Sequence, residues 1–325
     1  MSLRTRLAIL LAGVLVASAQ APARAADADV AEQIIAIMNK VFGSYPATRA
    51  NHAKGVVLEG TFTPGPEGAA LSKASLFKAA SIPVVVRFSD STGIPTIPDG
   101  DPNANPHGMS VKFRIPGGDE VDIVANSLQF FPVATGEEFR DLLQAVLDSP
   151  PGSPKPTKIE QFFAAHPAAA KAFASTSTPA SFATEEYNGV NSFVFVSPSG
   201  ERRAFRFKIT PDAGVTHLEA AEAAKLGKDG LVEEIRTRVG AKPVTFTLQA
   251  QLADPSDPVD DATKPLTADR KVVELGKIVL SRAGADPKDL GYLPTNLTDG
   301  IEPSGDPLIG VRTSSYAISF SRRAQ

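Results

Sequence analysis

The 325-residue sequence contains no cysteine and no tryptophan, and it has only four tyrosines and four histidines. Without cysteine the chain has no disulfide, thiolate metal site, iron–sulfur cluster or cysteine nucleophile, so any redox chemistry needs a cofactor. The 33 basic and 36 acidic residues give a net charge of −3, without the basic bias that would indicate nucleic-acid binding. An apolar content of 42% is ordinary for a folded protein and excludes disorder.

The N-terminal segment has the layout of a secretory signal peptide. Two arginines precede an apolar run that ends near Ala17, and a small–x–small cleavage site follows at Ala23–Ala25. The run is too short to span a bilayer comfortably, and it lacks the polar face that the alternative, an interfacial anchor, requires. We therefore expect residues 1–25 to be removed and residues 26–325 to form a single periplasmic or secreted domain without a membrane span.

Strands are predicted more often than helices. Period-two alternation of β-branched and aromatic residues predicts eight strands, at residues 55–63, 84–88, 109–115, 120–124, 191–197, 202–209, 244–251 and 271–280. Tight turns at Pro116–Gly118 and Pro198–Gly200 join consecutive strands as hairpins, which favours antiparallel pairing. The sequence therefore predicts an α+β fold around an eight-stranded antiparallel β-barrel with surrounding helices, large enough inside to hold a small ligand.

The helices are predicted between and around these strands. Helical spacing of apolar residues and capping patterns predict helices at residues 28–42, from Thr135 to about Leu147, from Thr157 to about Phe173 and from His217 to about Val239, and Pro307 opens a last helix.

Two polar residues lie at strand ends where they could face a cavity. His52 immediately precedes the first predicted strand, and its side chain could point into the barrel from the mouth. A second histidine within four residues and an HExxH motif are both missing, so a zinc site is not indicated and ordinary structure is the alternative. Asn126 ends another strand and either faces the same cavity or is a turn residue.

Charged and phenolic side chains complete the set of candidates. Arg87 interrupts a strand that otherwise reads as buried: it lies on an edge or the outer face, or it points inward and needs a carboxylate, most simply from an anionic ligand. Arg312 and Tyr316 are i,i+4 neighbours on the last helix, which is usually a packing arrangement. Opposite an oxophilic cation, the guanidinium would lower the pKa of the phenol and make a phenolate able to bind ferric iron.

Seven segments together resemble, in order, the haem catalase family. They are HAKG at 52–55, VVVRFS at 84–89, NPHGMSVKF at 105–113, DIVAN at 122–126, ELGKIVL at 274–280, GIEPS at 300–304 and RTSSY at 312–316. The resemblance to the family is weakest from about residue 147 to residue 243. Because the chain is shorter than a typical catalase and ends just past Tyr316, it resembles the small catalase-related peroxidase subgroup.

The resemblance implies a haem site. It implies haem b with Tyr316 as the proximal ligand of the iron and Arg312 as the charge partner of that ligand. His52 would be the distal acid–base residue, and Asn126 the distal amide that orients peroxide. The other implied contacts are those of Ser89 with the distal histidine, of Phe139 near the haem, and of Arg49, Arg87 and Arg323 with the haem propionates.

Some positions depart from the family pattern. Asn51 replaces the usual valine before the distal histidine, which makes the distal pocket more polar and puts rapid peroxide dismutation in doubt. His107 replaces an arginine, and we expect it to be a surface or turn residue. For His166 and His217, which match no family site, core or capping roles are expected.

The expected activity is that of a haem peroxidase, acting as a monomer or homodimer. It would reduce hydrogen peroxide or organic hydroperoxides with a small organic reductant, and any catalase activity would be weak. One alternative is a hydroperoxide isomerase on the catalase scaffold, which would need no added reductant. Another is a periplasmic haem carrier without turnover.

Overall fold

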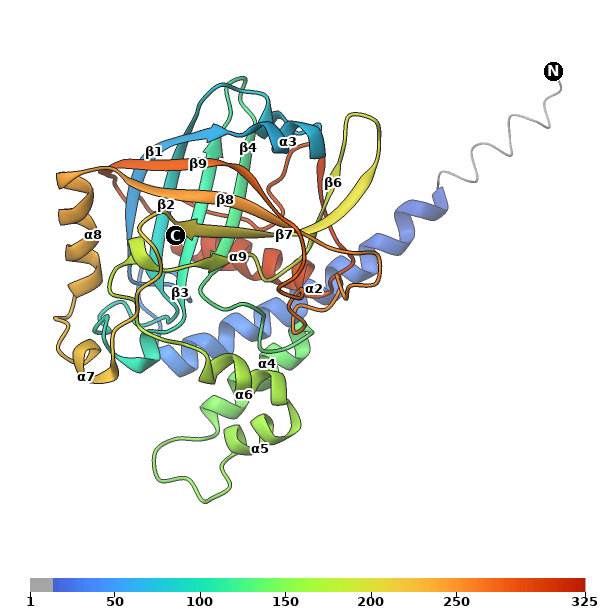
Figure 1. Ribbon diagram of the computed structural model, residues 1–325. Coiled ribbons are helices and arrows are strands. Elements are labelled where there is room, and N and C mark those ends of the chain that lie inside the picture. Colours follow the sequence, from blue (N-terminus) through green and yellow to red (C-terminus); the bar gives the residue numbers. More distant parts are fainter. Residues whose placement is uncertain (1–13, 325) are drawn as a thin grey trace.

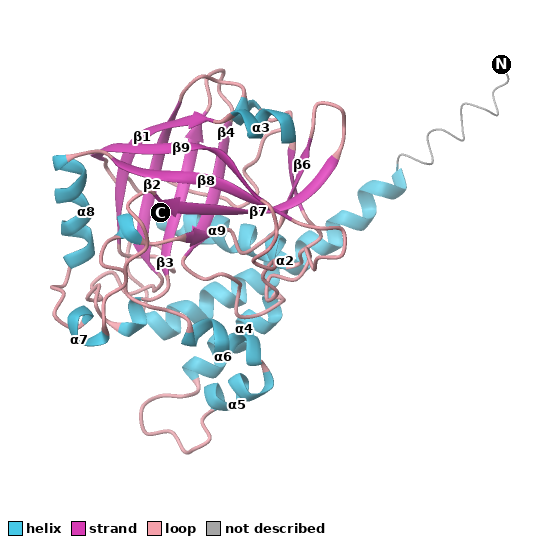
Figure 2. Ribbon diagram, viewed as in Figure 1, coloured by secondary structure: helices cyan, strands magenta, loops and turns pink. Residues whose placement is uncertain are grey.

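Antiparallel pairing joins the strands of residues 14–324, the part of the chain that the computed structural model describes, into one sheet. The strands are β1 (Gly55–Pro64), β2 (Ile82–Asp90), β3 (His107–Arg114), β4 (Glu120–Asn126), β5 (Tyr187–Asn188), β6 (Phe193–Val196), β7 (Arg202–Pro211), β8 (Val244–Leu252), β9 (Val272–Ala283) and β10 (Ile301–Pro303). Because β7 also pairs with β8, eight strands close a ring in the order β1–β2–β3–β4–β5–β7–β8–β9 (Figure 2).

This ring confirms the predicted α+β fold and eight-stranded antiparallel barrel. One member of the ring differs from the prediction. The predicted strand at residues 191–197 is β6, which lies beside β7 together with β10, whereas the ring contains β5. With only two residues, β5 is too short to carry a period-two pattern. Both predicted hairpin turns are confirmed, and Gly117 and Gly200 there adopt φ values of +106° and +87° that suit glycine.

The interior of the barrel is filled by side chains. Alternate residues of each strand point inward, as Val84, Val86 and Phe88 do on β2. Aromatic side chains dominate the core, among them Phe62, Phe88, Phe113, Phe205, Phe207 and Phe246. An eight-stranded barrel is just wide enough for its own side chains to fill it. The expectation of a ligand inside the barrel is therefore wrong, and the cavity described below lies against its outer face.

Helices cover that outer face. The α-helices of the described residues are α2 (Val14–Phe42), α3 (Pro66–Leu71), α4 (Gly136–Leu147), α5 (Lys158–Ala165), α6 (Pro167–Ala174), α7 (Ala220–Ala223), α8 (Gly230–Ala241) and α9 (Leu308–Ala324). The long helix α2 packs on α4 and α9 through Ile34 and Met38, which meet Leu143 and Val311. In Figure 1, α5 and α6 lie farther from the barrel than α4 does.

Three helix predictions need correction. The helix predicted from residue 28 is already present at Val14, the first described residue, and ends at Phe42 as predicted. The helix predicted from Thr157 is divided into α5 and α6 because Pro167 lacks the amide hydrogen that would continue it. The stretch from His217 holds two separate helices, α7 and α8, and His217 precedes both.

The predicted signal peptide is only partly described. Residues 1–13 lie outside the described residues, and residues 14–25 form the beginning of α2. Cleavage after residue 25 therefore stays a prediction. Within residues 14–324, none of the helices combines the length and apolar character needed to cross a bilayer.

Candidate functional site

A cavity of about 1520 Å³ lies between the outer face of β2–β4 and the helices α2, α4 and α9. Its volume exceeds the roughly 300–1000 Å³ of ordinary small-molecule sites. All the residues predicted for the site line this one cavity: Arg49, His52, Arg87, Ser89, Asn126, Phe139, Arg312, Tyr316 and Arg323. Segments far apart in the sequence are thus brought together at one cavity.

The imidazole of His52 is held against β2. Its Nδ1 lies 3.0 Å from Oγ of Ser89, and its Nε2 lies 3.4 Å from Oγ of Ser91. Burial and the positive charge of Arg87 lower the pKa of His52 to about 3. The ring is therefore neutral at physiological pH, and one nitrogen can accept a proton.

Space for this ring is left by a glycine on β3. Gly108 pairs with Ser89 across β2 and β3. A Cβ at position 108 would lie 2.9 Å from Nδ1 of His52 and 2.9 Å from Oγ of Ser89. Since these distances are shorter than carbon contacts allow, only glycine fits here without moving the ring.

Asn126 is both a turn residue and a cavity residue. Its Oδ1 accepts a hydrogen bond of 2.9 Å from the backbone amide of Leu128. The oxygen is thereby fixed in the turn, and Nδ2 has no hydrogen-bond acceptor among the described residues. The amide group can therefore offer a donor to a molecule in the cavity.

Arg87 lies on the outer face of the barrel and is nevertheless only 3% exposed. Leu290 and Tyr292 pack over this face against Val57 and Val85, which explains the burial. The carboxylate that a buried arginine needs comes from the chain itself, because Nε of Arg87 donates to Asp286 over 2.7 Å. An anionic ligand is thus not required to compensate its charge.

The two other predicted arginines lie beside it. Arg49 forms a two-pronged pair with Asp286, with distances of 2.9 and 3.2 Å, and it also donates to the carbonyl of Leu290. Arg323 donates to the carbonyls of Lys288 and Leu290. Burial and the nearby charge of Arg49 lower the pKa of Arg323 to about 10. Three guanidinium groups therefore gather at this end of the cavity.

The side chains of α9 form another part of the cavity wall. Tyr316 is half-buried, and its hydroxyl makes no hydrogen bond to any residue in the described range. Arg312 donates to Oδ1 of Asn191, whose Nδ2 donates to Asp306 over 2.7 Å. Arg312 thus has a buried polar partner of its own, and its predicted pairing with Tyr316 rests on their i,i+4 spacing.

Phe139 enters the cavity from α4. Its ring lies 5.3 Å from that of Phe131, measured between centroids, and it packs on the cluster that joins α2 and α4. This aromatic side chain gives the cavity an apolar wall that suits a flat ligand.

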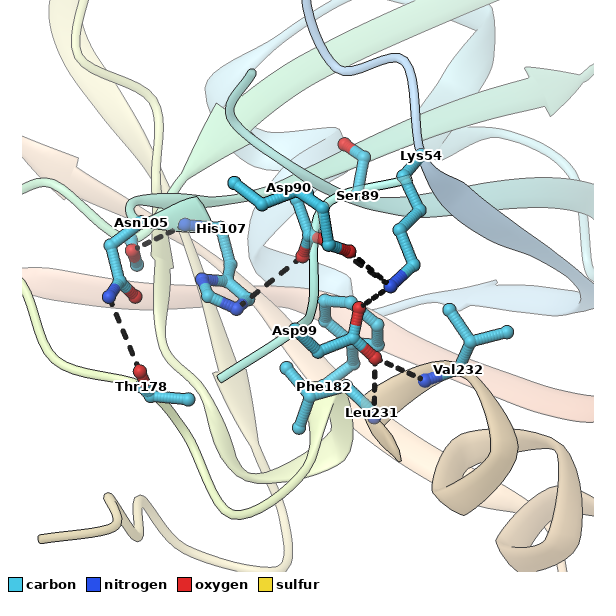
Figure 3. Close-up of polar contacts among 12 residues, drawn as sticks. Lys54, Ser89, Asp90, Asp99, Asn105, His107, Thr178, Phe182, Leu231 and Val232 are labelled. Atoms are coloured by element: carbon cyan, nitrogen blue, oxygen red, sulfur yellow. Dashed lines mark hydrogen bonds and ion pairs between the residues drawn. The ribbon is translucent and has the colours of Figure 1, made fainter. Parts of the chain in front are cut away.

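A buried polar cluster closes the end of the barrel next to Ser89 (Figure 3). Lys54 pairs with Asp99, whose other oxygen accepts from the backbone amides of Leu231 and Val232 at the beginning of α8. Asp90 lies 4.0 Å from Nζ of Lys54. Burial and the charge of Asp99 raise the pKa of Asp90 to about 8.

His107 belongs to this cluster, and its predicted place on the surface or in a turn is wrong. It is the first residue of β3, fully buried, with Nε2 3.7 Å from Oδ1 of Asp90 and its ring 5.5 Å from that of Phe182. The inward alternation of β3 explains this position. Burial and the charge of His217 lower the pKa of His107 to about 3.

The two other histidines lie apart from the predicted site. His166 joins α5 to α6, and its ring stacks on Phe162 with 3.9 Å between centroids. The ring of His217 pairs with Glu185 over 3.1 Å. His166 therefore has the predicted capping position, whereas His217 is a partly exposed residue that contacts the carboxylate of Glu185.

An eight-stranded antiparallel barrel thus carries, against its outer face, a cavity lined by histidine, asparagine and tyrosine side chains. The family model described as Catalase matches residues 17–324, and the chain therefore belongs to the catalase family. It is 32% identical to a catalase-related peroxidase of Mycolicibacterium paratuberculosis, over 90% of this chain and 94% of that protein. It is 31% identical to a catalase-related peroxidase of Synechococcus elongatus, over 90% and 88% of the two chains.

Solved structures support the same fold. A fungal catalase superimposes with a TM-score of 0.76 at 20% identity, covering 85% of this chain and 59% of its own. Catalase A from Saccharomyces cerevisiae gives a TM-score of 0.75 at 19% identity, covering 85% and 61%. The chain thus spans about three fifths of these larger catalases, and the likeness to them concerns the fold.

Proposed function

We propose that the protein is a haem-dependent peroxidase. It reduces hydrogen peroxide or organic hydroperoxides with a small organic electron donor, and its catalase activity is weak. The observation that carries this proposal is the convergence of His52, Asn126 and Tyr316 on one cavity. The names of the two catalase-related peroxidases similar to it support the same activity.

The residues of the cavity fit haem b. Phe139 offers an apolar wall, and the guanidinium groups of Arg49, Arg87 and Arg323 suit carboxylates such as propionates. The hydroxyl of Tyr316 has no other partner among the described residues and would be free to hold the iron. The described residues contain no group of three His, Asp or Glu side chains that could hold a bare metal ion. Bound haem would supply the iron centre that breaks the O–O bond of a peroxide.

On the distal side, His52 moves a proton. Its neutral imidazole takes the proton from the near oxygen of the peroxide and delivers it to the far oxygen, so that water rather than hydroxide leaves. The hydrogen bond to Ser89 fixes the plane of the ring during this transfer. Nδ2 of Asn126 donates to the oxygen on which negative charge develops.

On the α9 wall of the cavity, Tyr316 would hold the iron of haem through its phenol oxygen. Such a ligand would supply electron density that favours O–O cleavage, in the same sense as the thiolate of other haem enzymes. Arg312 lies one helical turn away on α9 and lines the same cavity. Its contact with Asn191 keeps the guanidinium in place.

Asn51 supports peroxidation over rapid dismutation. Its Oδ1 accepts from the backbone amide of His52 over 3.0 Å, and the residue lines the cavity. An amide where the family usually has valine makes the distal pocket more polar.

The export of the protein to the periplasm or beyond is also part of the proposal. N-terminal sequencing of the protein from its native cells tests it, and a first residue near Ala26 is expected.

One absorption experiment tests the activity. The protein is reconstituted with hemin, and its spectrum is recorded with and without hydrogen peroxide and a dye donor. We expect a high-spin ferric spectrum that is lost in Tyr316→Phe, together with dye oxidation that falls about 100-fold or more in His52→Ala. A protein that binds no hemin would overturn the proposal.

The same samples separate the alternatives. A haem carrier keeps its function in His52→Ala, and a hydroperoxide isomerase consumes a lipid hydroperoxide without any reductant. The peroxidase requires both the histidine and the donor.

A further inference from the structure

The backbone of His52 adopts a conformation that L residues seldom take. Its φ is +55°, and Ala47 is the only other non-glycine residue of the described range with a positive φ. Such a conformation persists when surrounding contacts hold it. The contacts around His52 therefore decide where the distal imidazole lies.

Arg87 supplies two of those contacts. One terminal nitrogen of its guanidinium donates to the carbonyl of His52 over 2.9 Å, and the other donates to the carbonyl of Ala53 over 3.2 Å. The planar, rigid fork of arginine fixes two successive carbonyls at once. Gly55 leaves space for it, because a Cβ there would lie 2.8 Å from Cζ of Arg87.

The orientation of Arg87 is set in turn by Asp286. The carboxylate accepts from Nε of Arg87 over 2.7 Å and from both terminal nitrogens of Arg49. It thereby joins two like-charged groups that would otherwise repel each other. Although burial opposes ionisation, these arginines lower the pKa of Asp286, so the carboxylate is charged at neutral pH.

Asp286 acts from outside the cavity. It belongs to the connection between β9 and β10 and is not one of the residues that line the cavity wall. Its side chain is 27% exposed, whereas that of Arg87 is 3% exposed. Its hydrogen bonds connect it to the distal site through the two arginines.

We propose that Asp286 is a positioning residue for the distal histidine: it orients Arg87 so that the guanidinium holds the carbonyls of His52 and Ala53 and fixes the left-handed backbone at His52. The proposal rests on the proposed function insofar as His52 acts on peroxide. Its structural part concerns the protein without haem and can be tested there.

The first test uses the haem-free protein. Asp286→Asn is compared with Asp299→Asn, a matched change in the same connection that removes an exposed carboxylate paired with Lys73. Diethyl pyrocarbonate modifies neutral imidazoles, and peptide mass spectrometry resolves the four histidines. We expect modification of His52 to become several-fold faster in Asp286→Asn alone, with His217 as the internal reference. An unchanged rate at His52 would overturn the proposal.

The second test uses the hemin-loaded protein and the rate of cyanide association. Hydrogen cyanide must give its proton to a base before the anion binds iron, so this rate reports the placement of His52. We expect about tenfold slower association in Asp286→Asn, the size of an outer-shell effect, and recovery in Asp286→Glu, which keeps the charge. Equal cyanide association rates in all variants, or a loss that Asp286→Glu does not restore, would contradict the positioning role of Asp286.

The proposed function and the inference about Asp286 can fail independently of each other. If hemin does not bind, the proposed function fails while the modification experiment still reports on Asp286. If hemin binds and dye oxidation occurs but both Asp286 tests show no change, the inference alone fails.

Discussion

The hydroxyl of Ser89 lies 3.0 Å from Nδ1 of His52, and this contact fixes the ring that faces the cavity. Ser89→Ala removes it while leaving the backbone pairing of β2 intact. We expect the reaction of the hemin-loaded protein with hydrogen peroxide to slow about 10- to 100-fold, measured by stopped-flow absorbance. Ser91→Ala is the matched control. The hydroxyl of Ser91 is 3.4 Å from Nε2 of His52, which is too long for a strong hydrogen bond. An equal loss of rate in both variants would therefore contradict the greater importance of Ser89.

The space that Gly108 leaves for His52 gives a second prediction. Gly108→Ala places a methyl group 2.9 Å from the ring. We expect overpacking to lower the free energy of unfolding by about 1–3 kcal/mol and to slow the peroxide reaction. Urea denaturation and stopped-flow kinetics measure the two effects. Ser110→Ala, which removes an atom from a neighbouring position of β3, should leave the stability within about 0.5 kcal/mol of the original protein.

The low pKa of His52 gives a third prediction. Burial and the charge of Arg87 lower it to about 3, so the imidazole is already neutral throughout the pH range 4–7. The second-order rate constant for hydrogen peroxide should therefore show no fall with a midpoint near 6.5, where an unperturbed histidine titrates. A pH profile with that midpoint, lost in His52→Gln, would contradict the burial of the ring.

The raised pKa of Asp90 gives a fourth prediction. Between about pH 4 and pH 8 the folded protein holds a proton on Asp90 that the unfolded chain has lost, so stability falls as pH rises through this range. The slope for one proton is at most about 1.4 kcal/mol per pH unit. Asp90→Asn should flatten this fall in urea denaturation at a series of pH values.

The buried histidines have the opposite effect on the pH dependence of stability, and they limit the pH range in which the effect of Asp90 can be measured. His52 and His107 are neutral in the folded protein down to about pH 3, whereas unfolded histidine gains a proton below about pH 6.5. Stability due to them therefore falls as pH decreases below 6.5. From pH 6.5 to 8 these histidines contribute little, and an equal slope there in Asp90→Asn and the original protein would refute the raised pKa of Asp90.

Much of the site could be predicted because its residues lie in short segments with recognisable order. His52, Asn126 and Tyr316 belong to three such segments, and all three line one cavity. The partners of these residues could not be predicted. Asp286 is 199 residues from Arg87 in sequence and lies in a connection without a repeating pattern, so no local signal links the two.

The sequence by itself determined seven of the eight barrel strands and their hairpins, because alternation and turn residues are local properties of the chain. The residues that meet at the cavity followed from the resemblance of seven short segments to a known family. Only the tertiary structure decided which face of the strands is the interior. On β2, Phe88 and Arg87 are both buried, one inside the barrel and one outside beneath Leu290 and Tyr292. A period of two separates the two faces of a strand but cannot tell which face is enclosed when both are covered. The positions of the cavity outside the barrel and of His107 inside it could therefore not be predicted from alternation.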